Sequence, residues 1–114
     1  MKLMTKTIER KLKQNHETIE KLLGDDTAIK PIVKFFGGSA TWLISEMHPD
    51  NDTLFGLCDL GLGTPDYGTV SLSELQSLKI PPFGLGVERD LLFIADKTLS
   101  KYADDAQISG RISA

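Results

Sequence analysis

The stretch that decides the fold is residues 32–60, which read IVKFFGGSATWLISEMHPDNDTLFGLCDL. Three runs in it are rich in apolar, β-branched and aromatic residues, as β-strands are, at 32–36, 41–47 and 53–60. Glycines at 37–38 and the Pro-Asp-Asn-Asp segment at 49–52 separate these runs, and both are typical of turns. Because such short connections join antiparallel neighbours, the stretch predicts a three-stranded meander.

A helical pattern precedes the meander. Apolar residues recur at helical spacing between Ile8 and Leu23, with charged residues among them. Thr5 or Thr7 can cap the start of this helix, and Gly24 can end it. We expect one N-terminal helix, which the pair at positions 15–16 can divide into two pieces.

A second helical signal follows the meander. Residues 61–68 are rich in glycine, proline and aspartate and predict a loop, and Thr69-Val70 can add a strand. Ser71 and Glu74 have the spacing of a capping box, and this predicts a short helix. Pro81-Pro82 stops this helix.

The C-terminal part is predicted to contain a last strand within residues 87–94 and a short helix at 98–103. We therefore expect one α+β domain over residues 1–104 and a flexible tail over 105–114. The fold prediction is an antiparallel sheet of four to five strands with an N-terminal helix and one or two short helices. The N-terminal helix and the Ser71 helix are expected to pack on one face of the sheet.

Composition limits the class of protein. The chain has 114 residues, 40% of them hydrophobic and 25% charged, which fits one globular domain. The net charge of −3 argues against a typical nucleic-acid binder, although basic residues gather between Lys2 and Lys13. Cys58 is the sole cysteine, so no intrachain disulfide can form. With no apolar signal core and no membrane-length apolar run, we expect a cytoplasmic protein that does not enter a membrane.

Motifs for catalysis or metal binding are weak. Two Gly-x-Gly pairs, at 61–63 and 84–86, lack the further glycines of a nucleotide-binding loop. The segment 48–52 holds a histidine and two aspartates but lacks the distal glutamate of a calcium loop. Cys58 lies in an apolar run, where a buried residue is a better interpretation than a nucleophile. We expect no catalytic residue, no metal and no cofactor.

Two features remain open to more than one interpretation. Glu88-Arg89-Asp90 precedes an apolar run and can be either a structural ion pair, which could also involve Glu46, or a polar site for a partner. Tyr67 and Phe83 lie beside glycine and proline, and each is either an exposed anchor for a partner or a ring packed on the sheet.

Together these segments resemble one family, the domain of unknown function 2958, over about residues 1–100. The resemblance rests on the opening Met1-Lys2-Leu3-Met4-Thr5-Lys6 and on the segments 33–36, 41–42, 54–56, 67–68, 71–75 and 83–90, with Glu46 and Phe93. The family has no assigned catalytic residues. The resemblance implies a bacterial protein carried by mobile DNA such as a phage, plasmid or conjugative element.

The resemblance leads to a functional expectation, which is association and not physical derivation. We expect an inhibitor that binds a host defence nuclease, most plausibly a CRISPR effector such as Cas9, by occlusion, as a monomer or weak homodimer. The charge and expected exposure of loops and strand ends select the partner-binding candidates, which are Asp50, Asp52, Asp59, Asp66, Tyr67, Glu88, Arg89 and Asp90.

Two other functions are weighed against this one. The first alternative is a DNA-transaction accessory of a plasmid or conjugative element, which would bind DNA through the basic residues between Lys2 and Lys13. The last is a hydrolase that uses Glu46, Glu88 and Asp90, which would need a carboxylate with a raised pKa in a cleft.

Overall fold

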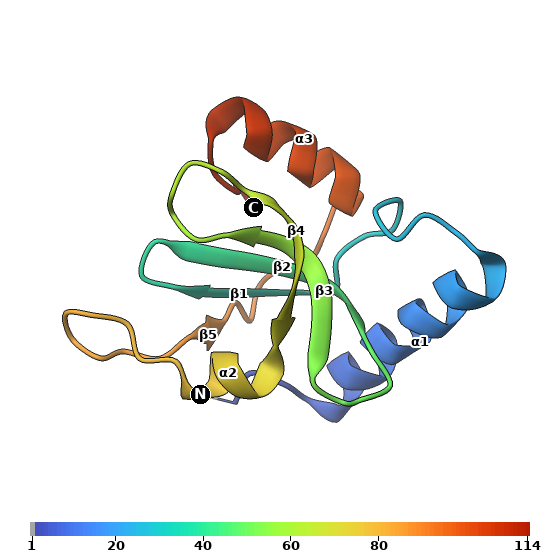
Figure 1. Ribbon diagram of the computed structural model, residues 1–114, viewed down its shortest axis with the longest axis horizontal. Coiled ribbons are helices and arrows are strands. Elements are labelled where there is room, and N and C mark those ends of the chain that lie inside the picture. The colour runs from blue at the N-terminus through green and yellow to red at the C-terminus, as the bar shows by residue number, and fades with distance from the viewer. Residues whose placement is uncertain (1) are drawn as a thin grey trace.

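The computed structural model describes residues 2–114 and has an α+β fold, as the sequence predicted (Figure 1). Five strands form one sheet, and three helices pack around it. The elements are α1 (Lys6–Leu22), β1 (Val33–Gly37), β2 (Ala40–Met47), β3 (Thr53–Asp59), β4 (Asp66–Ser71), α2 (Leu72–Ser77), β5 (Glu88–Arg89) and α3 (Leu99–Ser109).

The sheet has the strand order β4-β3-β2-β1-β5, and all of its neighbours are antiparallel. The first four strands follow each other in the chain, so the predicted meander is confirmed and β4 extends it. The chain then passes through α2 and returns to the opposite edge, where β5 pairs with β1. The two edges of the sheet are therefore β4 and the much shorter β5.

Helix α1 forms as its capping signals predict. Thr5 accepts a hydrogen bond from the amide of Ile8, and the buried Leu12 faces the core. The helix runs without a break through Asn15 and His16, because both side chains make contacts with β2. The helix ends at Leu22. The left-handed capping conformation expected of Gly24 is taken by Leu23, at φ 49°.

The two faces of the sheet carry separate cores. One core joins α1, α2 and the N-terminal segment to the sheet, and it includes Leu12, Phe35, Trp42 and Leu75. The other core lies under α3 and includes Leu43, Leu57, Leu99, Tyr102 and Ala106. Strand β2 supplies residues to both, which explains why it is buried along most of its length. The sequence predicted a short helix at 98–103, which is the first part of α3, but not its packing on the second face of the sheet.

A bulge in β2 shapes the end of the sheet near α1. Ile44 pairs with Gly56 and Glu46 pairs with Phe55, so Ser45 is the extra residue. Gly56 is required at this point, because a side-chain carbon there would overlap the backbone of Leu43. The bulge therefore lies between Gly56 of β3, where no side chain fits, and the Asn15–His16 part of α1.

Three elements differ in length from the prediction. Strand β4 begins at Asp66, inside the expected loop 61–68, because residues 66–68 pair in register with β3. The expected strand within 87–94 shrinks to Glu88–Arg89, since the chain turns away after Asp90. Helix α3 continues to Ser109, through the segment expected to be flexible, because Ala106 is fully buried against the sheet.

Candidate functional site

The aspartates of the β2–β3 turn are engaged within the fold. Asp50 accepts hydrogen bonds from the amides of Asp52 and Thr53, and from the Thr53 hydroxyl, and these bonds lower the pKa of Asp50 to about 2. Asp52 accepts from the Ser71 hydroxyl at 2.6 Å and from the Ser73 amide at 2.9 Å, and these bonds lower its pKa. Asp50 therefore holds the turn together, and Asp52 joins the turn to the start of α2.

Asp59 is buried, so the exposure for which the sequence selected it is absent. Its Oδ1 accepts from the amide of Gly61 at 2.8 Å, and its Oδ2 accepts from the amide of Ile112 at 2.9 Å. The carboxylate thus joins the end of β3 to the C-terminal segment, and we assign it a structural role.

Asp66 and Tyr67 begin the edge strand β4. Asp66 accepts from the amide of Tyr67 at 2.8 Å and is exposed. The ring of Tyr67 stacks on Phe55 with the centroids 6.3 Å apart, yet the residue keeps 36% exposure. The interpretation of Tyr67 as a ring packed on the sheet is therefore confirmed in part, and its role as an anchor for a partner stays a prediction.

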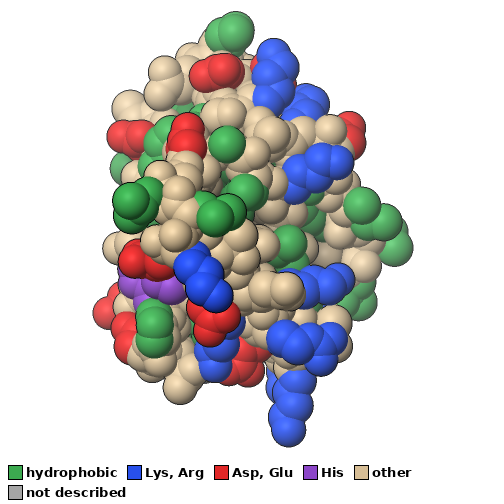
Figure 2. Space-filling view, turned by 90° about the vertical axis from the view of Figure 1, so that its right-hand side faces the viewer, with side chains coloured by type: hydrophobic (Ala, Val, Ile, Leu, Met, Phe, Trp, Pro, Cys, Tyr) green, Lys and Arg blue, Asp and Glu red, His purple; other side chains and the backbone are tan. Residues whose placement is uncertain are grey.

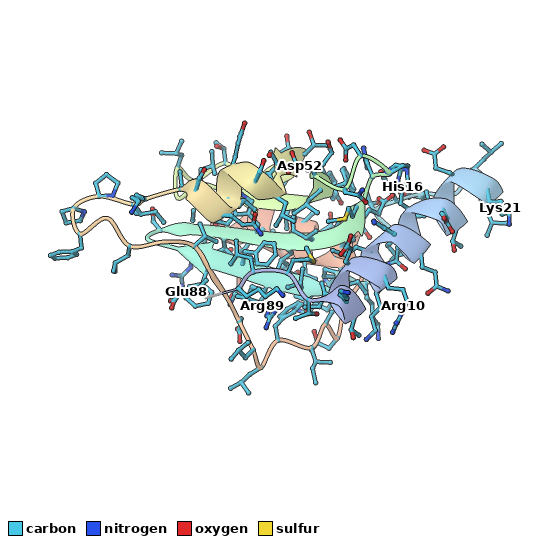
Figure 3. The ribbon with its side chains drawn as sticks, turned by 90° about the horizontal axis from the view of Figure 1, so that it is seen from below. Arg10, His16, Lys21, Asp52, Glu88 and Arg89 are labelled. Carbon is cyan, nitrogen blue, oxygen red and sulfur yellow. The ribbon has the colours of Figure 1, made fainter. Side chains whose placement is uncertain are left out.

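Glu88, Arg89 and Asp90 lie at the other edge. Glu88 is exposed and Arg89 donates to the carbonyl of Leu3 at 3.3 Å. Asp90 accepts from the amide of Leu92 and lies 3.7 Å from Nζ of Lys34. The eight predicted contact residues thus occupy four separate places, namely the β2–β3 turn, the buried end of β3, the β4 edge and the β5 edge, and they do not form one acidic surface (Figure 3).

A buried polar cluster joins α1 to the bulge of β2. Asn15 donates to the carbonyl of Ser45 at 2.9 Å, and Nδ1 of His16 shares a hydrogen bond of 3.1 Å with Oε1 of Glu46. The ring of His48 lies against that of His16, with the centroids 4.6 Å apart. Spacing alone could not reveal this cluster, because about thirty residues separate its two halves in the chain.

Glu46 is the unusual member of this cluster. It is 3% exposed, and its Oε2 is buried without a hydrogen-bond partner among the described residues. Burial raises the pKa of Glu46, while the bond from His16 opposes that shift. A raised pKa suits a general acid, but the other two carboxylates of the hydrolase hypothesis belong to β5 and the residue after it, and Figure 3 shows Glu88 far from His16, the partner of Glu46.

Cys58 is half-buried in β3, on the face packed by α1. Burial, with the nearby Asp66 charge, raises the pKa of the thiol to about 11. A thiol with this pKa is a poor nucleophile at neutral pH, which agrees with the structural interpretation of Cys58.

Large apolar side chains project from the segments on either side of β5. Phe83 is 82% exposed in the segment before β5, where Leu85 is also exposed. After β5, Leu92 is 90% and Ile94 is 88% exposed, with Leu91 beside them. The run 91–94 was expected in a strand, so its exposure was missed. Solitary exposed leucines are ordinary, but such a concentration indicates a contact surface.

Basic side chains line one side of α1. Lys6, Arg10 and Lys13 border a shallow hollow along the helix, and Glu9 pairs with Lys13 at 2.9 Å. Figure 2 looks at this end of the molecule, where most Lys and Arg side chains lie in the right half and most acidic ones in the left. In Figure 3, Arg10 points away from His16.

Residues 2–114 contain neither a group of side chains suited to a metal ion nor a membrane-spanning helix. No group of three or more His, Cys, Asp or Glu side chains in that range is placed to hold a metal ion. Within the same range, no helix combines the length and apolar character needed to cross a bilayer.

The chain matches the model of the family described as "Protein of unknown function (DUF2958)" over residues 3–113, and it therefore belongs to this family. No curated protein and no solved structure matches the chain significantly.

Proposed function

We propose that this member of the DUF2958 family is a cytoplasmic, non-enzymatic binding protein that inhibits a host defence nuclease by occlusion. A CRISPR effector such as Cas9 is the nuclease that we favour, on a protein carried by a phage, plasmid or conjugative element. The chain would act as a monomer or weak homodimer. The proposal starts from the family resemblance, and one structural observation supports its binding part.

That observation is the set of exposed apolar side chains in the segments before and after β5, namely Phe83, Leu85, Leu91, Leu92 and Ile94, which we call the β5 surface. Each large apolar side chain contributes about 1.5–3 kcal/mol when it passes from water into a packed contact. Interfaces typically place such residues at their centre and charged residues at the rim. In the chain, Glu88 and Asp90 stand between the two apolar segments, so the apolar side chains have charged neighbours, as at an interface.

Occlusion follows from this arrangement without any chemistry on the substrate. The apolar side chains would supply the affinity, and the carboxylates would face basic groups that the nuclease uses to hold nucleic acid. This mechanism uses Glu88 and Asp90 from the predicted contacts. It does not use Asp50, Asp52 or Asp59, because both carboxylate oxygens of each accept hydrogen bonds within the fold. In Asp90, Oδ1 accepts such a bond from Leu92, whereas Oδ2 lies 3.7 Å from Nζ of Lys34.

The test is cleavage of target DNA by purified Cas9 with guide RNA, in the presence of increasing amounts of the chain. We expect the wild-type chain to slow cleavage and the double variant Leu92→Ser, Ile94→Ser to require at least about tenfold more protein for the same effect. Leu22→Ser is the matched control, since Leu22 is 73% exposed at the far end of α1. Unchanged cleavage with excess wild-type chain would contradict the choice of Cas9.

A second candidate is the DNA-transaction accessory, which the basic side of α1 favours. Lys6, Arg10 and Lys13 lie along one hollow and could follow a phosphate backbone. Fluorescence anisotropy with a labelled duplex should then show binding that weakens steeply with salt and is lost in Arg10→Ala. Lys21→Ala, at the other end of α1, is the control (Figure 3). Absence of binding at low salt would dismiss this candidate.

A further inference from the structure

The edge strand β4 presents free backbone groups to solvent. Alternate residues of an antiparallel strand direct their amide and carbonyl groups to the neighbouring strand, and the residues between direct them away from it. The amide of Leu72 donates to the carbonyl of Asp52 on the β3 side at 2.8 Å, which sets this alternation. By the same alternation Val70, Gly68 and Asp66 face β3.

The outward set is therefore Tyr67, Thr69 and Ser71. The amide of Tyr67 agrees with this assignment, because it donates to the side chain of Asp66 and not to β3. For Thr69, the structure pairs its outward amide with no other backbone group within residues 2–114. Thr69 is also exposed, so an incoming strand can reach this amide.

Apart from Asp66, whose carboxylate covers the Tyr67 amide, β4 lacks the features that usually protect an edge strand. Natural sheets usually guard an edge with lysine, proline, a bulge or a very short strand. Residues 66–71 contain neither lysine nor proline, and their pairing with β3 runs without a register shift. The opposite edge is guarded by its shortness, since β5 consists of Glu88 and Arg89.

Acidic side chains surround the same edge. Asp66 is part of β4 and is exposed. Burial raises the pKa of Tyr67, a hydrogen bond with Thr27 opposes this shift, and the charges of Asp104, Asp25 and Asp26 add to it, so these three carboxylates act on the Tyr67 hydroxyl. Asp66 lies at the start of β4, Asp25 and Asp26 lie in the segment after α1, and Asp104 lies on α3, where it is exposed. An extended segment laid along β4 would therefore pass between carboxylates contributed by three parts of the chain.

We propose that the β4 edge binds an extended, positively charged segment of a partner protein, which adds to the sheet as a sixth strand. The carbonyl of Tyr67 and the amide and carbonyl of Thr69 supply the pairing, since the amide of Tyr67 is engaged by Asp66, and the surrounding carboxylates select lysine and arginine side chains. The exposed side of the Tyr67 ring packs against an aliphatic stem of such a residue. This binding edge lies at the opposite side of the sheet from the β5 surface and does not depend on the proposed inhibition.

The probe is a short acetylated and amidated peptide of alternating lysine and threonine, titrated into the labelled chain and followed by the amide signals in NMR. We expect the largest shifts at residues 66–71 and at Asp104. The variant Thr69→Pro removes the outward amide and leaves the pairing with β3 intact, so it should weaken binding about tenfold, the equivalent of one backbone hydrogen bond. Thr69→Ala keeps the amide and is the matched control.

A charge variant keeps the test decisive if Thr69→Pro fails to fold. Asp66→Asn combined with Asp104→Asn should weaken binding of the lysine peptide, and the matching glutamate peptide should not bind the wild-type chain. Shifts located away from β4, equal binding of the two peptides, or unchanged affinity in a folded Thr69→Pro variant would each overturn the proposal. Self-association that Thr69→Pro abolishes, seen by sedimentation without peptide, would overturn it too, because a second copy would then occupy the edge.

Discussion

Replacing Asp59 should destabilise the fold while leaving any partner-binding surface unchanged. Its two carboxylate oxygens each accept one backbone amide, from Gly61 and from Ile112. A hydrogen bond to a charged group contributes about 1.5 kcal/mol or more, so Asp59→Ala should lower the free energy of unfolding by about 3 kcal/mol. For a chain of this size the melting temperature should fall by about 4 °C for each kcal/mol, about 12 °C in all.

The isosteric variant Asp59→Asn separates the two bonds. One amide oxygen can still accept, but the NH2 group meets a backbone donor, so about half of the loss is expected, about 1.5 kcal/mol. Urea unfolding followed by circular dichroism measures both variants. Losses below about 0.5 kcal/mol, the size expected of surface substitutions, would refute the structural role of Asp59 and return it to the predicted contacts.

Three further outcomes are expected. Because burial raises the pKa of Glu46 above 4.5, the stability that its proton contributes is present below that pH and is lost as pH rises through the folded-state pKa. Glu46→Gln should therefore gain stability over the wild type at pH 7 and lose that advantage near pH 4.5; a pH-independent difference in urea unfolding would count against this. Cys58, with its pKa at about 11, should react with iodoacetamide at pH 8 at least about 50-fold more slowly than in the urea-unfolded chain; equal rates would mean an accessible thiol. Ser71→Ala removes the cap of α2 and should cost about 1 kcal/mol, whereas Ser77→Ala at the end of that helix should cost little.

Local signals in the chain predicted the elements that depend on neighbouring residues. The turns at 37–39 and 49–52 required antiparallel pairing, and the caps at Thr5 and Ser71 are present. Predictions failed where a distant contact overrides a local preference. Residues 105–109 are mostly small or polar by sequence, yet they complete α3, since Ala106 and the bond from Ile112 to Asp59 hold the C-terminal segment to the sheet.

The candidate contacts show the same limit. Charge and turn composition indicated where acidic residues occur, but the tertiary structure decides which remain available to a partner. Asp50 and Asp52 lie in the turn that the sequence predicted, and their oxygens are used by neighbouring amides and hydroxyls. The run 91–94, in which Leu91, Leu92 and Ile94 are exposed and Phe93 packs under α3, was assigned to a strand because apolar composition alone does not distinguish a buried strand from an exposed contact segment.

The sequence by itself determined the α+β class, the meander and the family, because turns, caps and apolar spacing act over a few residues. Only the tertiary structure brought His16 to Glu46, buried Asp59 and left the β4 edge open. These features depend on which distant segments meet across the sheet. That is settled by how two cores pack on opposite faces of β2, and no local pattern records it.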